Sequence, residues 1–308
     1  MRGMKLLVIG TLAFDSIETP FDRREDVLGG SATHFAHAAN FFGEVRLVGV
    51  VGTDFPDEAL KDFRERGIDC SGVEVAEGKT FRWGGEYSYD LSTRETLFTE
   101  LGVFADFRPR IPEAFRSAKL VFLGNIHPDL QADVLDQVDA PDLVACDTMN
   151  YWIEGEPEAL ARLMPRVNVL MINDEEARQF AGVSNLVTAA KKIRDLGPEW
   201  IIVKKGENGA ILFGPDEIFF MPAYPLEDVH DPTGAGDAFA GGFMGYLAAR
   251  GGADPAAFRR AVVHGCAMGS FAVEDFTVDR FRTLTRAELA QRLREFKRMT
   301  SFEMDPVS

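Results

Sequence analysis

Cysteine is scarce in this chain of 308 residues, which has only Cys70, Cys146 and Cys266. Their odd number and wide spacing exclude a regular framework of disulfide bonds, and no two of them have the short spacing of zinc ligands. A chain that does not use cysteine for cross-links is typical of a reducing compartment. We therefore expect a cytoplasmic protein.

Long apolar runs are also missing. The longest runs, such as Leu6–Ile9 and Leu120–Leu123, fall far short of the roughly 20 residues that a membrane-spanning helix needs. The first residues lead straight into one of these short runs and do not have the pattern of a secretory leader. We expect no membrane partner.

Basic residues are few compared with acidic ones: 33 Lys and Arg face 49 Asp and Glu, for a net charge of −16. A surface with this charge repels a nucleic acid unless a local basic patch intervenes. Lys191-Lys192 and Lys204-Lys205 are isolated pairs and form no such patch. We expect no nucleic-acid partner.

What the chain does have is a series of short apolar segments rich in Val, Ile and Leu, without the alternation of a half-exposed strand. They predict buried strands at Lys5–Gly10, Val45–Val51, Leu120–Gly124, Asp142–Cys146, Asn168–Asn173, Trp200–Lys204 and Ala210–Phe213. Helical patterns lie at Thr33–Phe42, Asp57–Arg66, Pro128–Gln137, Pro157–Leu163, Glu175–Phe180, Asn185–Leu196, Gly236–Arg250, Asp254–Phe271 and Arg286–Lys297. Repeated strand–helix units predict a single three-layer α/β/α domain over residues 1–308, with a mostly parallel central sheet.

Two segments interrupt this alternation, at residues 13–24 and 73–107. The second contains Phe81–Tyr89, an aromatic stretch with the alternating pattern of a strand. These segments predict a small antiparallel β-sheet. It could form a lid over one edge of the main domain or simply extend the main sheet, and the pattern does not choose between the two.

The sharpest local signal is the segment Asp231–Phe239. Gly234 and Gly236 allow backbone conformations that other residues avoid, and a helix is predicted to begin near Gly236. The unpaired amides at such a start, at the positive end of the helix dipole, form an anion site. Asp237 falls in the first turn and could accept a proton from an attacking hydroxyl while the amides stabilise a phosphoryl group.

Simpler interpretations of this segment exist. A lone Gly-x-Gly-Asp is often only a turn, with the carboxylate favoured by the helix terminus. The segment is not a dinucleotide-binding fingerprint, because the required third glycine is replaced by Phe239. The chain also has no Gly-x4-Gly-Lys-Ser/Thr loop, which excludes the P-loop enzymes.

The segment resembles the C-terminal signature of the ribokinase-like (pfkB) carbohydrate and nucleoside kinases, with Pro232 at a position where the family usually has Thr. Further family motifs follow one another in the expected order along nearly the whole chain. The matching segments are Gly10–Asp15, Gly29-Gly30, Gly49–Asp54, Gly67–Asp69, Asn173–Glu176 and Lys204–Gly209. The resemblance implies a ribokinase-like fold with a β-sheet lid and transfer of the γ-phosphate of ATP to a hydroxyl of a sugar or nucleoside. It also implies Mg²⁺ and, as a further candidate, a monovalent cation such as K⁺.

The resemblance implies roles for individual residues. Asp237 would be the general base, and the backbone at Gly234, Ala235 and Gly236 would form the anion hole. The acceptor would be bound by Asp15, Gly29 and Gly30. Asn125 is a further candidate because it follows the predicted strand Leu120–Gly124, where it could contact the acceptor or only form a turn. Asn173 and Glu176 would organise Mg²⁺, Glu176 through water, although both residues would equally suit a helix N-terminus. The other residues implied at the nucleotide site are Lys204, Gly206, Gly209, His264 and Ala267. Lys204 would equally suit a surface position at a strand end, and an ordinary packing role suits His264 at least as well.

One position departs from the sugar-specific pattern. After Gly29-Gly30 those members usually carry Asn four residues on, where this chain has His34. An imidazole cannot reproduce the geometry of an amide. We therefore expect D-ribose to be a poor acceptor and a nucleoside or larger sugar to be a better one, unless His34 only packs its helix.

The predicted lid could have two further roles. Arg82 and Arg94 lie in it, and either could bind a charged group of the substrate. The lid could also join two copies of the chain in a homodimer.

The alternative function is a non-catalytic sugar or nucleotide sensor with the same fold, although a sensor has no need of Asp237.

Overall fold

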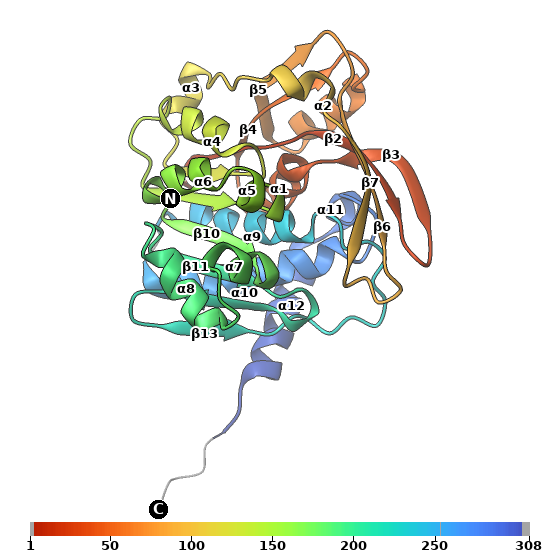
Figure 1. The fold of residues 1–308 in the computed structure, drawn as a ribbon. Helices are drawn as coiled ribbons and strands as arrows, with labels where there is room; N and C mark the ends of the chain where they lie inside the picture. The colour runs from red at the N-terminus through yellow and green to blue at the C-terminus, as the bar shows by residue number, and fades with distance from the viewer. Residues whose placement is uncertain (1–2, 253, 304–308) are drawn as a thin grey trace, which may run out of the picture.

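The computed structural model describes residues 3–252 and 254–303. These residues form one large nine-stranded sheet and one small four-stranded sheet (Figure 1). In sheet order, the large sheet consists of β13 (Ile218–Met221), β12 (Ala210–Phe213), β11 (Trp200–Lys204), β10 (Val169–Asn173), β9 (Leu143–Asp147), β8 (Leu120–Leu123), β1 (Leu6–Ile9), β4 (Val45–Gly52) and β5 (Ile68–Ala76).

The large sheet is parallel from β11 to β5, and β12 and β13 add an antiparallel edge. Its strands are buried on both faces. Leu6 and Val8 of β1 belong to one hydrophobic cluster, whereas Leu7 and Ile9 belong to the other. A strand that alternates between two cores requires helices on both sides of the sheet.

The helices form the two outer layers. One face is covered by α1 (Ser31–Asn40), α2 (Asp57–Glu65), α9 (Ala235–Arg250), α10 (Pro255–Ala272), α11 (Asp279–Thr283) and α12 (Arg286–Thr300). The other face is covered by α3 (Glu113–Arg116), α4 (Pro128–Leu135), α5 (Asn150–Gly155), α6 (Pro157–Leu163), α7 (Asp174–Ala181) and α8 (Leu186–Arg194). The predicted three-layer α/β/α fold is confirmed.

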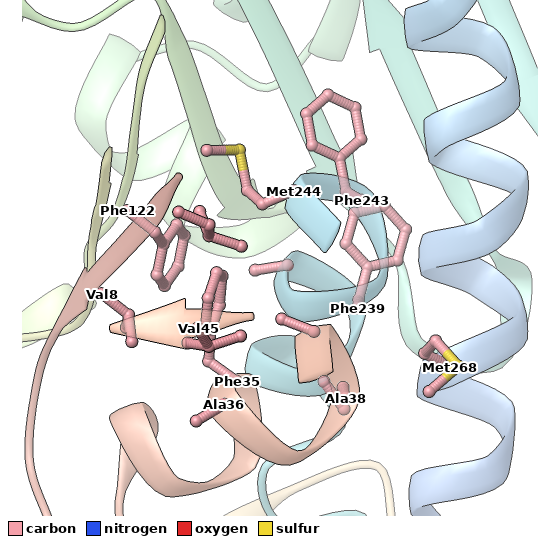
Figure 2. Packing of buried hydrophobic residues seen from close by; sticks show 14 of the residues in the cluster. Val8, Phe35, Ala36, Ala38, Val45, Phe122, Phe239, Phe243, Met244 and Met268 are labelled. Carbon is pink, nitrogen blue, oxygen red and sulfur yellow. The ribbon is translucent and has the colours of Figure 1, made fainter. Parts of the chain in front are cut away.

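The hydrophobic core beneath α1 and α9 fixes the positions of these two helices, which carry residues of the candidate site. Phe35 of α1 stacks on Phe122 of β8, with ring centroids 4.3 Å apart. Figure 2 shows this pair beside Phe239 and Phe243 of α9, with Met268 of α10 nearby. The small residues that begin α9 let it approach α1 closely: a Cβ atom at Gly241 would overlap the carbonyl oxygen of Phe35.

The small sheet has the order β3 (Arg23–Gly29), β2 (Ala13–Glu18), β6 (Phe81–Tyr87) and β7 (Arg94–Glu100). It is separate from the large sheet, so it is a lid and not an extension of the main sheet (Figure 1). Two antiparallel hairpins, β2–β3 and β6–β7, are joined through a parallel β2–β6 pair, which differs from the fully antiparallel sheet expected.

The lid boundaries differ from the expected segments 13–24 and 73–107. β3 continues to Gly29, beyond the first segment, and residues 73–76 belong to β5 of the large sheet. β5 pairs with β4 through a register shift, and its buried pattern is irregular, which explains why it does not read as a buried strand. β13 was not expected either, because its side chains are mostly exposed at the edge of the sheet.

The topology brings several polar side chains to one edge of the large sheet. β8, β9, β10 and β11 are adjacent and parallel, so their carboxyl ends lie side by side. Asn125, Asp147, Asn173 and Lys204 lie at or just beyond these ends. Ligands of open α/β sheets bind outside the carboxyl ends of the strands. The candidate active site therefore lies at this edge of the sheet.

Candidate active site

Helix α9 begins at this edge with a left-handed residue. Gly234 has φ 73° and precedes Ala235, the first helical residue, one position earlier than expected. A Cβ atom at Gly234 would overlap the ring of His34, so this position needs glycine for its space as well as its backbone conformation. No side chain caps the helix start, and the Ala235 amide donates to the Pro232 carbonyl at 3.2 Å, which leaves the amides of Gly236 and Asp237 available to an anion.

Buried hydrogen bonds hold the loop before α9 in place. One carboxylate oxygen of Asp231 accepts from the amide of Thr233 at 2.8 Å, and the other accepts from the amide of Thr277 at 3.1 Å. Burial raises the pKa of Asp231, which is 1% exposed. The loop that forms the anion site is therefore tied to the segment after α10.

Asp237 lies in the first turn of α9, inside the site. Burial and, to a smaller extent, the Asp147 carboxylate raise the pKa of Asp237 to about 8, against the opposing effect of the Lys204 ammonium. The Asp15 carboxylate raises it as well, by a smaller amount. A carboxylate with a pKa near the working pH is suited to general-base catalysis.

Asp15 does not follow the first strand in a loop, as expected, but lies within β2 of the lid sheet. It is 5% exposed and accepts a hydrogen bond from the amide of Gly30 at 3.3 Å. A Cβ atom at Gly29 would overlap the Asp15 carboxylate, and Gly30 has φ 94°. Burial raises the pKa of Asp15 to about 7, against the effect of the Gly30 amide. The glycine pair therefore makes room for this buried carboxylate.

Asn173 and Glu176 form a capping box at the start of α7. The Asn173 side chain accepts from the amide of Glu176 at 2.7 Å, and the Glu176 side chain accepts from the amide of Asn173 at 2.9 Å. Burial also raises the pKa of Glu176 to about 7, with Lys204 lowering it and Asp147 raising it. The helix-capping interpretation is thus correct, and the same carboxylate faces the charges of the site.

Lys204 ends β11 and points into the same cluster. Its ammonium donates to the Asp147 carboxylate at 3.0 Å, and a Cβ atom at Gly236 would lie 3.0 Å from it. Burial alone would lower the pKa of Lys204, but Asp147, Glu176 and Asp237 more than offset this effect and raise it. The ammonium therefore stays charged between β9 and the start of α9.

Asn125 and the two glycines after β11 lie at the same edge. The Asn125 side-chain oxygen accepts from the Trp152 indole at 2.8 Å, which fixes the orientation of the amide. Gly206 and Gly209 flank a short 3-10 turn with φ 53° and 86°. A Cβ atom at Gly209 would overlap the carbonyl oxygen of Met221, so the turn is held tightly against the end of β13.

Three predicted residues are placed differently from the others. His34 is 1% exposed, packs beneath Gly234, and has no hydrogen-bond partner at either ring nitrogen. His264 stacks on Tyr246, nine residues further along α9 than Asp237, which corresponds to about 13 Å of helix. Ala267 is fully buried on α10. The structure does not bring His264 to the charged cluster.

The two lid arginines differ. Arg82 forms ion pairs with Asp26 and Asp54 and lies over the ring of Phe14, which occupies it within the lid. Arg94 lies over the Trp83 ring at 4.8 Å, and its charge helps to lower the pKa of Asp15, of Glu176 and of Asp237. The charge of Arg94 therefore acts on the carboxylates of the site.

Sequence reasoning did not select Asp147, Asp231 or Tyr87. Asp147 directly follows a predicted strand, the same signal that selected Asn125, so it could have been found. Asp231 is the first residue of the segment Asp231–Phe239, but nothing in the sequence pattern assigns it a role. Tyr87 bonds to Thr233, 146 positions away, and no local pattern indicates such a contact.

The site fits ATP and Mg²⁺. Uncapped amides and the Lys204 ammonium suit phosphate oxygens, and Glu176 supplies the hard oxygen that Mg²⁺ prefers. Within residues 3–252 and 254–303, no group of three or more His, Cys, Asp or Glu side chains is arranged to hold a metal ion. Mg²⁺ commonly keeps several waters and binds through one or two carboxylates and substrate phosphates, which needs no preformed cage.

Known proteins are similar to this chain in sequence. Residues 6–280 match the model of the pfkB family of carbohydrate kinases. A cytidine kinase from Thermococcus kodakarensis is 32% identical over 254 residues, 80% of this chain and 90% of that protein. An aminoimidazole riboside kinase from Salmonella typhimurium is 36% identical over 295 residues, 89% of this chain and 90% of that protein.

A solved structure agrees with the architecture. The nucleoside kinase of Methanocaldococcus jannaschii superposes with a TM-score of 0.76, covering 96% of this chain and 100% of that one, at 20% identity. In the part of this chain that the structure describes, no helix has the length and apolarity to cross a bilayer.

Proposed function

The chain belongs to the pfkB family of carbohydrate kinases and is a sugar or nucleoside kinase; from this premise we propose that Asp237 is its general base. The observation that carries the proposal is the position of Asp237. It is a buried carboxylate with a raised pKa, in the first turn of a helix whose amides are uncapped. A base beside an anion site can deprotonate the hydroxyl as it attacks a phosphoryl group.

The acceptor is held by groups of the lid and of the helix that follows it. Asp15 accepts hydrogen bonds from acceptor hydroxyls, and Gly29 and Gly30 let those hydroxyls approach the backbone closely. Asn125 offers its amide in the orientation fixed by Trp152. Together these contacts bring one hydroxyl to Asp237, and alignment of the reacting groups is itself a large part of catalysis.

The phosphate side is built by other residues. The amides of Gly236 and Asp237 and the ammonium of Lys204 stabilise charge on the transferred group, while the Ala235 amide is bonded to the Pro232 carbonyl and helps to shape the anion loop. Glu176 and Asn173 orient the water shell of Mg²⁺, and Gly206 and Gly209 shape the nucleotide-facing turn after β11. ATP supplies the phosphoryl group, and Mg²⁺ neutralises its charge.

The acceptor we propose is a nucleoside or a sugar with a larger ring, with D-ribose a poor substrate. His34 stands where sugar-specific members carry Asn, and its neutral ring packs directly beneath Gly234. Burial lowers the pKa of His34 to about 3, so the ring cannot act as a cation toward the substrate. The named activities of the relatives, on cytidine and on aminoimidazole riboside, support a nucleoside acceptor.

Two finer elements belong to the same proposal. A monovalent cation such as K⁺ would raise the rate, because the buried carboxylate of Asp231 beside the anion loop would be stabilised by a nearby cation. A titration with KCl against choline chloride at constant ionic strength tests this.

Two copies would pair through their lids, because the edge strand β7 is exposed along its whole length, including Leu97 and Phe98. Sedimentation equilibrium tests the dimer.

The deciding experiment is an ATP-consumption assay over a panel of sugars and nucleosides. The expected result is ADP formation that depends on one class of acceptor, with a phosphorylated product identified by mass spectrometry. Binding of an acceptor and ATP without any turnover over the panel would favour a sensor on the same fold and would overturn the proposed function.

A further inference from the structure

The Lys204 ammonium is held from two sides. Lys204 ends β11 and Asp147 ends β9, and β10 lies between these two strands. The lysine side chain therefore spans the carboxyl end of β10 to place its ammonium 3.0 Å from an Asp147 oxygen. On its other side, the ammonium lies against Gly236 in the first turn of α9.

Both charges of the pair are nearly removed from solvent. The Lys204 side chain is 18% exposed and that of Asp147 is 8% exposed. An isolated buried ammonium is costly and tends to lose its proton or to move toward another counterion. The Asp147 carboxylate therefore keeps the lysine charged and in place before any phosphate is bound.

Asp147 is itself fixed by the end of its strand. Its second carboxylate oxygen accepts from the amide of Thr148 at 2.9 Å, and its backbone carbonyl accepts from the Gln131 side chain at 3.2 Å. These bonds leave one oxygen directed at Lys204. The carboxylate is thus a rigid anchor rather than a mobile surface charge.

The other carboxylates near the ammonium are already engaged. Glu176 accepts from the amide of Asn173 in the capping box, and Asp237 is the proposed base. If Asp147 lost its charge, Lys204 would be drawn toward Glu176 and Asp237. A lysine paired with the base would obstruct it and would leave the anion site.

We propose that Asp147 is a positioning residue that holds the Lys204 ammonium at the mouth of the α9 anion site, so that a nucleotide phosphate meets a cation already in place. The proposal rests on the proposed phosphate role of that site. Asp147 does not touch the phosphate; it acts through Lys204 alone. Lys204 has three N–H donors, so it can keep its bond to Asp147 while it donates to a phosphate oxygen.

The test is a double-mutant cycle on nucleotide binding, which requires no acceptor. Binding of the Mg²⁺ complex of a non-hydrolysable ATP analogue is measured by calorimetry in the wild type, Asp147→Asn, Lys204→Met and the double variant. We expect Asp147→Asn to weaken binding by about 10-fold, the usual effect of losing a group that orients a ligand-binding side chain. In the Lys204→Met background, Asp147→Asn should cause no further weakening.

A control and a second variant make the outcome decisive. Asp129→Asn removes a carboxylate from an exposed ion pair with Arg162, and it should bind the analogue like the wild type. If Asp147→Asn does not fold, as judged by its melting temperature, the same cycle is run with Asp147→Glu. The loss with Glu should be smaller but should again vanish when Lys204 is Met.

Three results would overturn the proposal: unchanged or tighter binding in the Asp147 variant, or equal weakening in both backgrounds. The last would mean that Asp147 acts independently of Lys204. Failure of the wild type to bind the analogue at all would instead count against the proposed function. Binding by the wild type with no coupling between the two residues would sink only this inference.

Discussion

The hydroxyl of Tyr87, at the end of lid strand β6, lies 2.9 Å from the hydroxyl of Thr233 in the loop before α9. The amide of Thr233 in turn donates to the buried Asp231 carboxylate. The lid is therefore bonded directly to the loop that shapes the anion site. Arg94 pairs with Tyr87 across β6 and β7, so the same contact brings the lid cation toward the carboxylates of the site.

Tyr87→Phe should loosen this contact without removing the ring. We expect the KM of the acceptor to rise by about 5-fold, the value of one net hydrogen bond, with a smaller fall in kcat. Steady-state kinetics with varied acceptor provide the measurement. Tyr89→Phe is the matched control, because Tyr89 is 82% exposed on the same lid and should leave both constants unchanged. Equal effects of the two substitutions would refute the coupling.

Asp237→Asn should lower kcat by about 10²–10⁴, the usual contribution of a general base, because the amide cannot accept the proton. Binding of ATP, measured by calorimetry, should remain. Asp228→Asn, in the exposed loop before α9, is the control and should retain wild-type turnover. Near-normal turnover of Asp237→Asn would show that another group takes the proton.

The same variant tests the raised pKa through stability. Asp237 has a pKa of about 8 in the folded chain against an ordinary value of 3.8, so the folded state holds a proton that the unfolded state releases. This group favours folding below pH 4, and that contribution is lost as the pH rises to about 8. Asp237→Asn has no such loss, so its melting temperature relative to the wild type should rise by a few °C between pH 5 and pH 8 and then level off. A difference that does not vary with pH would contradict the raised pKa.

Glu176→Gln should raise the Mg²⁺ concentration for half-maximal rate, because an amide is a weaker ligand than a carboxylate for the ion and its ordered waters. We expect a shift of about 10-fold, as for other residues that orient a metal through its outer shell. The substitution preserves a side-chain oxygen for the capping box. Glu175→Gln, at the exposed neighbouring position, should leave the requirement unchanged. An unaltered Mg²⁺ dependence in Glu176→Gln would remove this residue from the metal site.

His34→Asn should shift acceptor preference toward D-ribose. Neither ring nitrogen of His34 has a partner within the chain, so a change here alters shape and hydrogen bonding next to Gly234 rather than charge. The ratio of kcat/KM for ribose to that for the best nucleoside should rise by about 10-fold, a typical effect of one recognition group. If the wild type already prefers ribose, the idea fails. If the ratio is unchanged in the variant, His34 only packs its helix.

The sequence predicts most of the large domain because both faces of its sheet are buried. Val45–Val51 and Trp200–Lys204 are apolar without interruption, and the observed strands differ from the prediction by no more than a residue at either end. The lid is predicted less well. Its strands are short and partly exposed, and the parallel pairing of Ala13–Glu18 with Phe81–Tyr87 joins segments that no local pattern relates.

The site shows the same division. Asp237, Asn173 and Glu176 could be predicted because each belongs to a local motif at a helix start. The partnership of Asp147 with Lys204 could not, because β9 and β11 do not pair with each other and are brought together by β10, which lies between them. His264 shows a second limit: its place on a helix could be predicted, but its stacking on Tyr246 of another helix could not.

The presence of Asp15 in β2 has an evolutionary consequence. The carboxylate that we propose binds the acceptor lies in the small sheet with Trp83 and Arg94, whereas Asp237 and Lys204 lie in the large domain. Substitutions in the small sheet could retarget the enzyme to another acceptor while leaving the phosphoryl-transfer groups intact. Such modularity would account for relatives of this chain that are named for acceptors as different as cytidine and 6-phosphofructose.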